Sequence, residues 1–321
     1  MRRIKKCTVF LLLLCLLLNL AGCAAAQKPL RVTLVLKTVT EVAEFWGTLL
    51  SGVEKAAEEY GVELKVLTSP REIDIDKQIE LIRQVTADKP DVMILSAADY
   101  DRCAEATEEA IAAGIGVVAI DTDVNAAGRA CFVGSNSYEI GLEMGRAMAS
   151  YLPEGGKVAV IQHMLTTTTG IERTRGVLDA LNEAGNIEIL GSFCCDNSTE
   201  QAQTITTELL SADPEIRGFV CTNEVCNVGA ANALVELGMG GRVYVVGCDN
   251  SQRQIQFLEQ NIIQAIVTQR PFNMGYMAVQ QAVRVAQGET PEDFVEVACV
   301  LITRENMYTQ ENQKLLFPVL R

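Results

Sequence analysis

Short apolar runs alternate with amphipathic stretches along almost the whole chain after residue 30. The apolar runs are rich in Val and Ile, as is typical of strands buried on both faces of a parallel sheet. In the stretches between them, apolar residues recur at the spacing of a helix. The predicted strands are 31–37, 62–67, 91–97, 116–121, 130–134, 157–162, 187–193, 218–222, 242–249 and 265–269. The predicted helices are a segment that ends at Tyr60 and the segments 75–86, 103–113, 138–151, 171–184, 199–212, 225–237 and 252–260.

This alternating pattern closes once and then begins again. The strand at 130–134 ends a first series, and the helix at 138–151 opens a second one. Strands that alternate with helices form parallel, doubly wound sheets. We therefore predict an α/β protein with two doubly wound, flavodoxin-like parallel-sheet lobes, which agrees with a chain of roughly 300 residues exceeding one typical domain.

The N-terminal residues follow a different pattern. Four basic residues within the first six positions precede an apolar run at 7–20, which is too short to span a bilayer. This arrangement is typical of a secretory signal peptide. The sequence Leu-Ala-Gly-Cys that ends at Cys23 resembles the lipobox of bacterial lipoproteins, in which that cysteine is lipidated and becomes the mature N-terminus. We expect a signal peptide at 1–22, a tether at 23–30 and a membrane anchor through the lipid on Cys23.

The charge of the chain is strongly negative. The formal net charge at pH 7 is −14, and loss of the signal peptide with its four basic residues makes it −18. Nucleic-acid binding needs clusters of Lys and Arg that meet phosphates. We therefore exclude nucleic acid as a partner and expect a well-solvated monomer.

The cysteines and the histidine are not arranged as metal ligands. Eight of the eleven cysteines follow Cys23, mostly inside apolar runs, and they form no C-x-x-C pair. His163 is the only histidine, and the chain has neither a G-x-S-x-G elbow nor a P-loop. We expect no metal, no cofactor and no enzymatic activity. Whether the neighbouring Cys194 and Cys195 form a disulfide stays open.

Polar side chains lie at the carboxyl ends of several predicted strands, where ligands bind to doubly wound sheets. Asp and Asn at such positions are also common helix N-caps, but their repetition in both halves of the chain favours a binding site. For the two aromatic candidates, packing between helix and sheet is the alternative interpretation. The candidates are Asp121, Asn223, Asp249 and Gln269 at strand ends, with Phe45, Trp46 and Arg175 early in the following helices. Glu224 follows Asn223 at the same strand end.

Several segments together resemble the ligand-binding segments of type I periplasmic solute-binding proteins of the ribose and galactose class, whose fold is shared by LacI-type repressors. The resemblance runs from Arg31 to Met307. The segments, in the family's order, are EFWGTLLSGVEKAAEEYGVEL, VVAIDTD, RTRGVL, CTNE, VVGCDN and IVTQRPFNMGYMAV.

The resemblance implies that the seven candidate residues contact a sugar. It also places Thr122 where the ribose pattern has an arginine, Asn197 where a second aromatic would stack, and Ala43 where an asparagine precedes the aromatics. Carboxylates, amides and a guanidinium suit a hydroxyl-rich guest. The loss of one cation disfavours acidic or phosphorylated sugars. A neutral or weakly cationic polyol, an aminosugar and a small furanosyl signal all stay open.

The resemblance further implies a hinge with three crossings, near 134–136, 269–271 and 298–303. Lobe 1 is then expected to hold 31–134 and 270–297, and lobe 2 to hold 135–269 and 298–321. Because the candidate residues come from both lobes, closure over the guest completes the site.

The expected protein is a lipoprotein at the outer face of the bacterial cytoplasmic membrane, which delivers its solute to an ABC permease. Presentation of the same solute class to a membrane-bound histidine kinase or chemoreceptor is the alternative. A scaffold that has lost ligand binding, which Thr122 and Asn197 suggest, is a third interpretation. A repressor of this fold is excluded by the secretory start and by the lack of DNA-binding helices.

Overall fold

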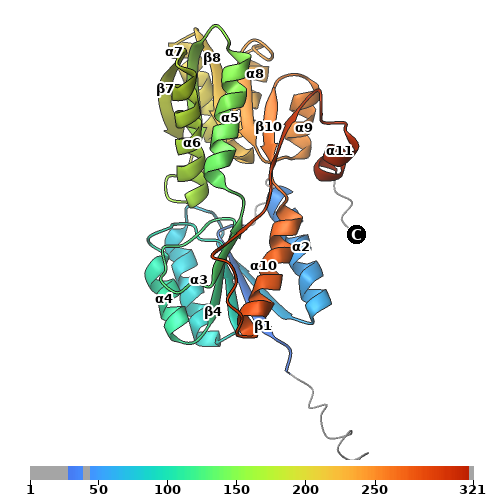
Figure 1. Cartoon of the computed structure of the whole chain (residues 1–321). Helices are drawn as coiled ribbons and strands as arrows, with labels where there is room; N and C mark the ends of the chain where they lie inside the picture. The colour runs from blue at the N-terminus through green and yellow to red at the C-terminus, as the bar shows by residue number, and fades with distance from the viewer. Residues whose placement is uncertain (1–27, 39–43, 318–321) are drawn as a thin grey trace, which may run out of the picture.

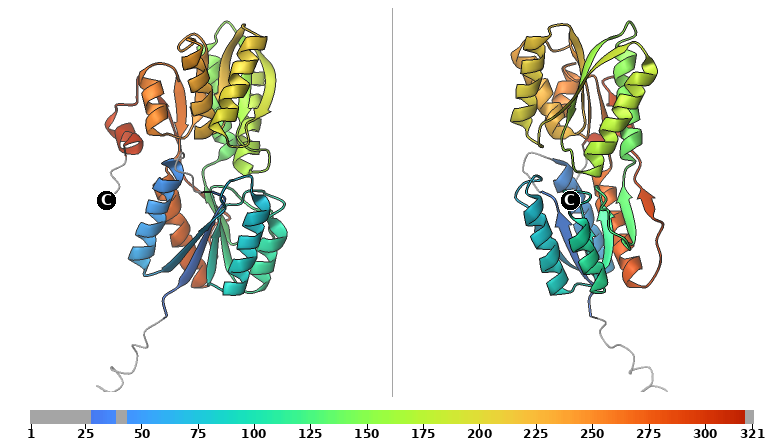
Figure 2. Two further views of the ribbon diagram at one scale, coloured as in Figure 1. Left: turned by 180° about the vertical axis from the view of Figure 1, so that it is seen from behind. Right: turned by 90° about the vertical axis from the view of Figure 1, so that its left-hand side faces the viewer.

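The computed structural model describes residues 28–38 and 44–317, and Figure 1 shows that they form two α/β lobes, one above the other. Each lobe contains a six-stranded sheet with helices on both faces (Figure 2). The predicted fold class is therefore confirmed. In the described part of the chain, no helix is both long enough and apolar enough to span a bilayer.

The first lobe, called lobe 1 here, holds the first five strands and one strand from near the C-terminus. Its sheet has the order β11-β5-β4-β3-β1-β2 and is parallel throughout. The strands are β1 (Arg31–Leu36), β2 (Glu63–Thr68), β3 (Val92–Leu95), β4 (Gly116–Ile120), β5 (Cys131–Gly134) and β11 (Phe294–Glu296). The helices are α2 (Glu44–Tyr60), α3 (Ile75–Asp88), α4 (Ala104–Ala112) and α10 (Pro271–Ala286).

The second lobe, lobe 2, repeats this plan with the order β12-β10-β9-β8-β6-β7. Its edge strand β12 is antiparallel to β10, which is a departure from the all-parallel sheet predicted from the sequence. The strands are β6 (Gly156–Gln162), β7 (Ile187–Cys194), β8 (Ile216–Cys221), β9 (Tyr244–Cys248), β10 (Ala265–Thr268) and β12 (Val300–Thr303). The helices are α5 (Ser137–Tyr151), α6 (Thr168–Ala184), α7 (Thr199–Ala212), α8 (Glu224–Glu236), α9 (Gln252–Glu259) and α11 (Gln310–Leu316).

The described chain passes between the lobes three times. The passages lie between β5 and α5, between β10 and α10, and between β11 and β12. In Figure 1 these segments connect the facing ends of the two lobes, and β1 begins at the end of lobe 1 that is remote from lobe 2. The three passages therefore lie at residues 135–136, 269–270 and 297–299.

Helix α10 is held tightly against α2, although the two are far apart in the sequence. A Cβ atom at Gly52 would lie 2.0 Å from the carbonyl oxygen of Phe272, and one at Gly275 would lie 2.2 Å from that of Leu49. Only glycine permits so close an approach of two helix backbones. The late segment of the chain is therefore an integral part of lobe 1.

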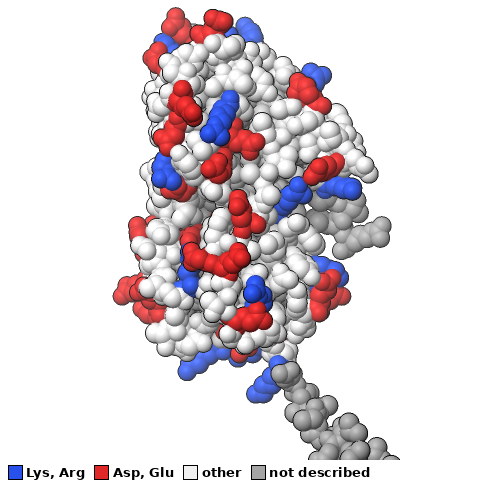
Figure 3. Space-filling model, viewed as in Figure 1, with Lys and Arg blue, Asp and Glu red and all other residues white. Residues whose placement is uncertain are grey.

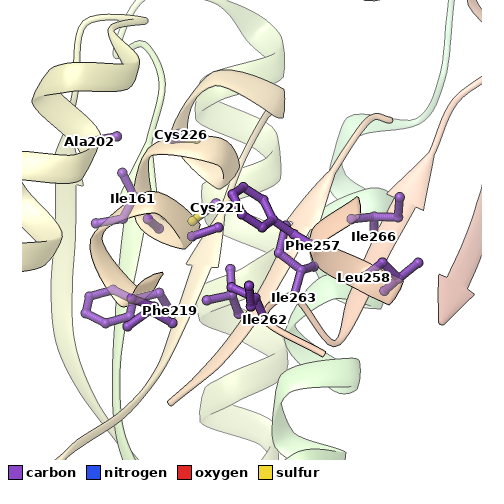
Figure 4. Close-up of a cluster of buried hydrophobic side chains, with 14 of the residues drawn as sticks. Ile161, Ala202, Phe219, Cys221, Cys226, Phe257, Leu258, Ile262, Ile263 and Ile266 are labelled. Atoms are coloured by element: carbon purple, nitrogen blue, oxygen red, sulfur yellow. The ribbon is translucent and has the colours of Figure 1, made fainter. Parts of the chain in front are cut away.

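Each lobe has its own apolar core, built from the buried strands predicted by the Val- and Ile-rich runs. In lobe 2, Phe219 on β8 and Phe257 on α9 are among the largest fully buried side chains. Figure 4 shows these rings with Cys221 and neighbouring isoleucines between sheet and helices. Burial of this apolar surface fixes the strands whose carboxyl ends carry the polar residues described next.

Candidate functional site

A small cavity lies between the lobes, at the carboxyl ends of both sheets. The cavity has a volume of about 40 Å³. Most of its polar side chains are buried between the two lobes. Lobe 1 contributes Lys37, Phe45, Trp46, Glu72 and Asp121 to its lining. Lobe 2 contributes His163, Thr169, Arg173, Asn197, Asn223, Glu224, Val225 and Asp249, and Gln269 comes from the passage that follows β10.

Two aspartates occupy equivalent places in the two lobes. Asp121 directly follows β4 and Asp249 directly follows β9, and these strands have the same rank in their sheets. Both residues have a left-handed backbone, with φ of 62° and 69°. Non-glycine residues rarely adopt this conformation, and it is often found at functional sites. The strained turn directs each carboxylate from its strand end toward the cavity.

In lobe 1, a buried lysine links two carboxylates. The Nζ atom of Lys37 lies 2.8 Å from Glu72 Oε1 and 3.3 Å from Asp121 Oδ2. Burial by itself lowers the pKa of Lys37, but the two carboxylates outweigh it and the pKa is raised. Lys37 is therefore a permanent cation that neutralises part of the acidic lining.

The aromatic residues form one wall of the cavity. The rings of Phe45 and Trp46 meet edge to face, with centroids 5.1 Å apart. Trp46 also packs into the lobe 1 core, and its ring centroid lies 5.7 Å from Lys37 Nζ. Core packing and cavity lining, which the sequence left as alternatives, both apply to Trp46.

In lobe 2, a buried arginine lies beside Asp249. Arg173 donates through an Nη atom to the carbonyl oxygen of Thr222 (2.9 Å), and the same atom is 3.8 Å from Asp249 Oδ2. Its Nε group is buried without a hydrogen-bond partner. Gln269 donates to Asp249 Oδ1 over 2.6 Å. The unpaired Nε–H is a donor available to an oxygen of a guest.

A chain of amides connects the two lobes across the cavity. Asn223 donates to Asn197 Oδ1 (2.8 Å), and Asn197 donates to Glu72 Oε2 of lobe 1 (2.8 Å). Asn223 also caps helix α8 by accepting from the backbone of Cys226. The N-cap role and the cavity role, which appeared as alternatives in the sequence, coexist in this residue.

Two further titratable groups face the cavity. His163 is buried, with its ring nitrogens 2.7 Å from Thr222 Oγ1 and 3.2 Å from Thr169 Oγ1. Burial, with Lys37 and Arg173 nearby, lowers the pKa of His163 well below its usual value, so the ring is neutral. Burial and the neighbouring Asp249 raise the pKa of Glu224 to about 8.

The structure brings together most of the residues that the resemblance implied. Those that line the cavity are Phe45, Trp46, Asp121, Asn197, Asn223, Asp249 and Gln269. Cys23 and Ala43 lie outside the described residues.

Arg175 does not line the cavity, so its assignment needs correction. Its side chain is 58% exposed, pairs with Glu172 and stacks on the ring of Tyr138. Arg173, two residues earlier on α6, lies in the cavity instead. Two residues correspond to about 200° around a helix, so the two arginines point in nearly opposite directions.

Thr122 is also absent from the cavity wall. It is fully buried beneath Asp121 and donates to the carbonyl oxygen of Ala97 (2.7 Å). Its hydroxyl lies 3.1 Å from that of Ser96, whose own oxygen is 3.5 Å from Asp121 Oδ2. Thr122 supports the turn that holds Asp121 rather than contacting a guest.

The sequence interpretation missed Lys37, Glu72, His163 and Arg173, and it noted Glu224 at a strand end without counting it among the contacts with the guest. Lys37 and His163 directly follow the strands β1 and β6, so the strand-end rule that identified Asp121 applied to them as well. Glu72 lies in the loop after β2, where no sequence signal marked it. Cys194 and Cys195, whose pairing the sequence left open, carry free thiols.

The loop before α6 makes a second set of contacts between the lobes. Thr166 donates through Oγ1 to the carbonyl oxygen of Ala98 (2.9 Å), and its own carbonyl accepts from the backbone of Tyr100 (3.0 Å). Thr168 Oγ1 accepts from the backbone N–H of Asp123 (3.1 Å). These contacts join the two lobes outside the cavity, so we expect them to stabilise the arrangement in which the lobes meet.

We expect Thr166→Val to weaken ligand binding about two- to tenfold, because one hydrogen bond contributes about 0.5–1.5 kcal/mol to the closed form. Calorimetry would measure the affinity and small-angle scattering the shift toward open molecules. The matched control is Thr207→Val, whose hydroxyl bonds only within α7. An unchanged affinity and shape in Thr166→Val would show that this loop does not contribute to closure.

Comparisons with known proteins agree with this geometry. A family model described as the periplasmic binding protein domain matches residues 33–290. The D-ribose/D-allose-binding protein of Pseudomonas aeruginosa is 26% identical over 274 residues, which cover 83% of this chain and 85% of that protein. The D-allose-binding periplasmic protein of Escherichia coli is 25% identical over 303 residues, which cover 90% of this chain and 96% of that protein.

A similar solved structure is that of a carbohydrate transporter solute binding protein from Agrobacterium radiobacter, in complex with D-arabinose. It superposes with a TM-score of 0.87 at 23% identity and covers 91% of this chain and 100% of its own. At this identity the superposition establishes the shared fold.

Proposed function

We propose, since this chain belongs to the periplasmic binding protein family, that it captures a sugar or sugar-like polyol between its lobes and delivers it to an ABC importer. The family predicted from the sequence is confirmed. Membership in a family of binding proteins also supports the expectation that the chain is not an enzyme.

The observation that carries the proposal is the convergence of Asp121, Arg173 and Asp249 on one closed cavity from two lobes. Carboxylates accept hydrogen bonds from hydroxyl groups, and the free Nε–H of Arg173 donates to an oxygen. Trp46 and Phe45 offer aromatic surface to the apolar C–H groups of a ring. A small polyol presents all three kinds of partner at once.

Closure is the step by which the guest is recognised. Lys37, Phe45, Trp46 and Asp121 lie on lobe 1, whereas Arg173 and Asp249 lie on lobe 2, so an open molecule offers only half of the contacts to a guest. A guest that binds the closed form better shifts the population toward it. The membrane partner then distinguishes loaded from empty molecules by their shape.

A thermal-shift screen of residues 24–321 against pentoses, hexoses, aminosugars, alditols and nucleosides tests the proposal, with calorimetry on each hit. We expect at least one compound of the sugar or polyol class to bind at micromolar affinity or better, about −8 kcal/mol. Failure of every sugar and polyol, alongside binding of an unrelated class, would contradict it.

We further propose that the protein is a lipoprotein held outside the cytoplasmic membrane by lipid on Cys23. The position of β1, which begins at the pole of lobe 1 remote from lobe 2, supports this arrangement, because the tether then leaves the cleft unobstructed (Figure 1). On the face that Figure 3 shows, acidic and basic side chains are interspersed over both lobes, as suits a solvated domain.

Cys23→Ser is expected to move the protein from the membrane pellet into the soluble or secreted fraction, because serine has no sulfur to form the thioether that attaches the lipid. Cell fractionation with immunoblotting measures the distribution. Cys15→Ser, in the apolar run of the signal peptide, is the matched control and should stay with the membrane. Persistent pelleting of the Cys23 variant after a carbonate wash would contradict lipidation at this residue.

A further inference from the structure

We propose that the cavity is built for a polyol that carries an amino group, whose ammonium lies against Glu224. This inference rests on the proposed sugar-binding function and names the substrate class more closely. Among the carboxyl groups of the cavity lining, only that of Glu224 has no cationic side chain of the lining beside it.

The charges of the lining are unequal. Four carboxyl groups, those of Glu72, Asp121, Glu224 and Asp249, face two cations, Lys37 and Arg173. Lys37 forms ion pairs with both Glu72 and Asp121, and Arg173 lies beside Asp249. Buried charges are costly unless they are paired. A cationic guest would therefore fit this closed cavity better than a neutral one.

Glu224 is the carboxyl residue of the lining that takes part in none of these ion pairs. It is 4% exposed, and its Oε2 atom is buried without a hydrogen-bond partner. It begins helix α8, and its backbone N–H donates to Asp249 Oδ2 (3.2 Å). Asp249 itself is already satisfied by Gln269 and by that N–H, so the vacant acceptor position belongs to Glu224.

The groups that surround the Glu224 carboxyl explain why it retains a proton when the cavity is empty. Burial has the largest effect, and Asp249 from the end of β9 and Glu44 from α2 of lobe 1 add negative charge. Hydrogen bonds from the Ser251 side chain and from the Glu44 backbone act in the opposite direction, and the Glu44 carboxylate accepts from the backbone N–H of Gln252. These influences raise the pKa of Glu224 to about 8.

An ammonium guest changes this balance. It binds best to ionised Glu224, so binding at neutral pH releases the Glu224 proton to solvent. Its affinity should rise with pH by at most about tenfold per unit below the pKa. His163 does not contribute in this range, because its lowered pKa keeps it neutral. A neutral polyol would instead accept a hydrogen bond from protonated Glu224, and its affinity would not rise with pH.

The experiment compares glucosamine, galactosamine and mannosamine with glucose, galactose and mannose on residues 24–321. Calorimetry at about pH 5.5 and about pH 7, where the amines keep their proton, gives the affinities. Two buffers with different heats of ionisation give the number of protons released. We expect at least one aminosugar to bind more tightly than its parent, with rising affinity and the release of about one proton.

Glu224→Gln should remove the pH dependence and bring the affinity ratio between amine and parent close to one. The unfolded chain releases the Glu224 proton near pH 4.5, whereas the folded chain keeps it to about pH 8. Folding stability therefore falls as the pH rises through this window, and the variant should unfold at an equal or higher temperature near pH 7. Glu54→Gln, an exposed change on α2, is the matched control and should leave both readouts unchanged.

The outcomes separate this inference from the proposed function. If the neutral sugars bind and no aminosugar exceeds its parent, or if the pH dependence survives in Glu224→Gln, sugar binding stands and the amine site is wrong. If neither series binds, at either pH, the sugar-binding proposal fails for these rings and the amine site fails with it.

Discussion

Arg173→Ala is expected to weaken ligand binding about tenfold to a hundredfold. A hydrogen bond from a charged group contributes about 1.5–3 kcal/mol, and the truncation also leaves Asp249 without its neighbouring cation. Arg173 is 2% exposed, so its contacts are shielded from solvent. Calorimetry with the guest found in the sugar screen measures the loss.

The chain supplies its own control for this experiment. Arg175→Ala changes an arginine on the same helix, two residues away, whose side chain is 58% exposed and pairs with Glu172. Arg175 does not line the cavity, and its exposed ion pair contributes only about 0–1 kcal/mol to stability, so the affinity should stay close to that of the unchanged protein. The opposite ranking of the two variants would restore Arg175 as the ligand residue. Unfolding midpoints of both empty proteins exclude a folding defect as the cause.

Lys37→Met is expected to lower the free energy of unfolding by about 3–5 kcal/mol, because it leaves two buried carboxylates facing each other without their cation. The Nζ atom now lies 2.8 Å from Glu72 and 3.3 Å from Asp121, and all three side chains are almost fully buried. Methionine fills a similar volume, so the expected loss reports on charge rather than on a cavity. Urea unfolding of the empty protein measures it.

Lys55→Met is the matched control for that change. Lys55 also approaches two carboxylates, Glu58 and Glu59, at 3.2 and 3.4 Å, but its side chain is 48% exposed. We expect a change below about 1 kcal/mol there. Equal effects of the two substitutions would mean that the buried triad of Lys37 does not stabilise lobe 1. A double replacement with Glu72→Leu should recover part of the loss, since it removes one uncompensated charge.

The fold was predictable because its signals are local. Val- and Ile-rich runs identify buried strands wherever they occur, and the restart after β5 marks the second lobe. The antiparallel pairing of β12 was not predictable, because a short strand carries no mark of its direction. It became an edge partner of β10 only through the third passage between the lobes.

The site was predictable only in part, for reasons that individual residues make clear. Asp121 and Asp249 end strands, so the strand-end rule found them. The choice between Arg173 and Arg175 depends on how α6 is rotated about its axis, and the segment RTRGVL, which contains both arginines, does not show that rotation. Glu72 reaches the cavity from a loop, and its importance comes from Lys37 and Asn197, both distant in sequence.

Asn197 illustrates a second limit. The resemblance treated it as a lost stacking residue, but the structure gives it a polar task between Asn223 and Glu72. Its backbone is left-handed, with φ of 53°, a conformation that asparagine tolerates better than an aromatic residue does. The left-handed backbone at this position therefore suits asparagine, which a comparison of residue types alone does not show.

The tight packing of α10 on α2 has a consequence for how the chain acquires its shape during synthesis. The sheet of lobe 1 cannot be completed before α10 and β11 are synthesised, and these elements follow nearly all of lobe 2 in the sequence. Until then one edge of β5 and one side of α2 are uncovered. The segment between β5 and α10, by contrast, already contains most of the strands and helices of lobe 2. We expect lobe 2, which at that stage lacks only β12 and α11, to complete its folding before lobe 1 does.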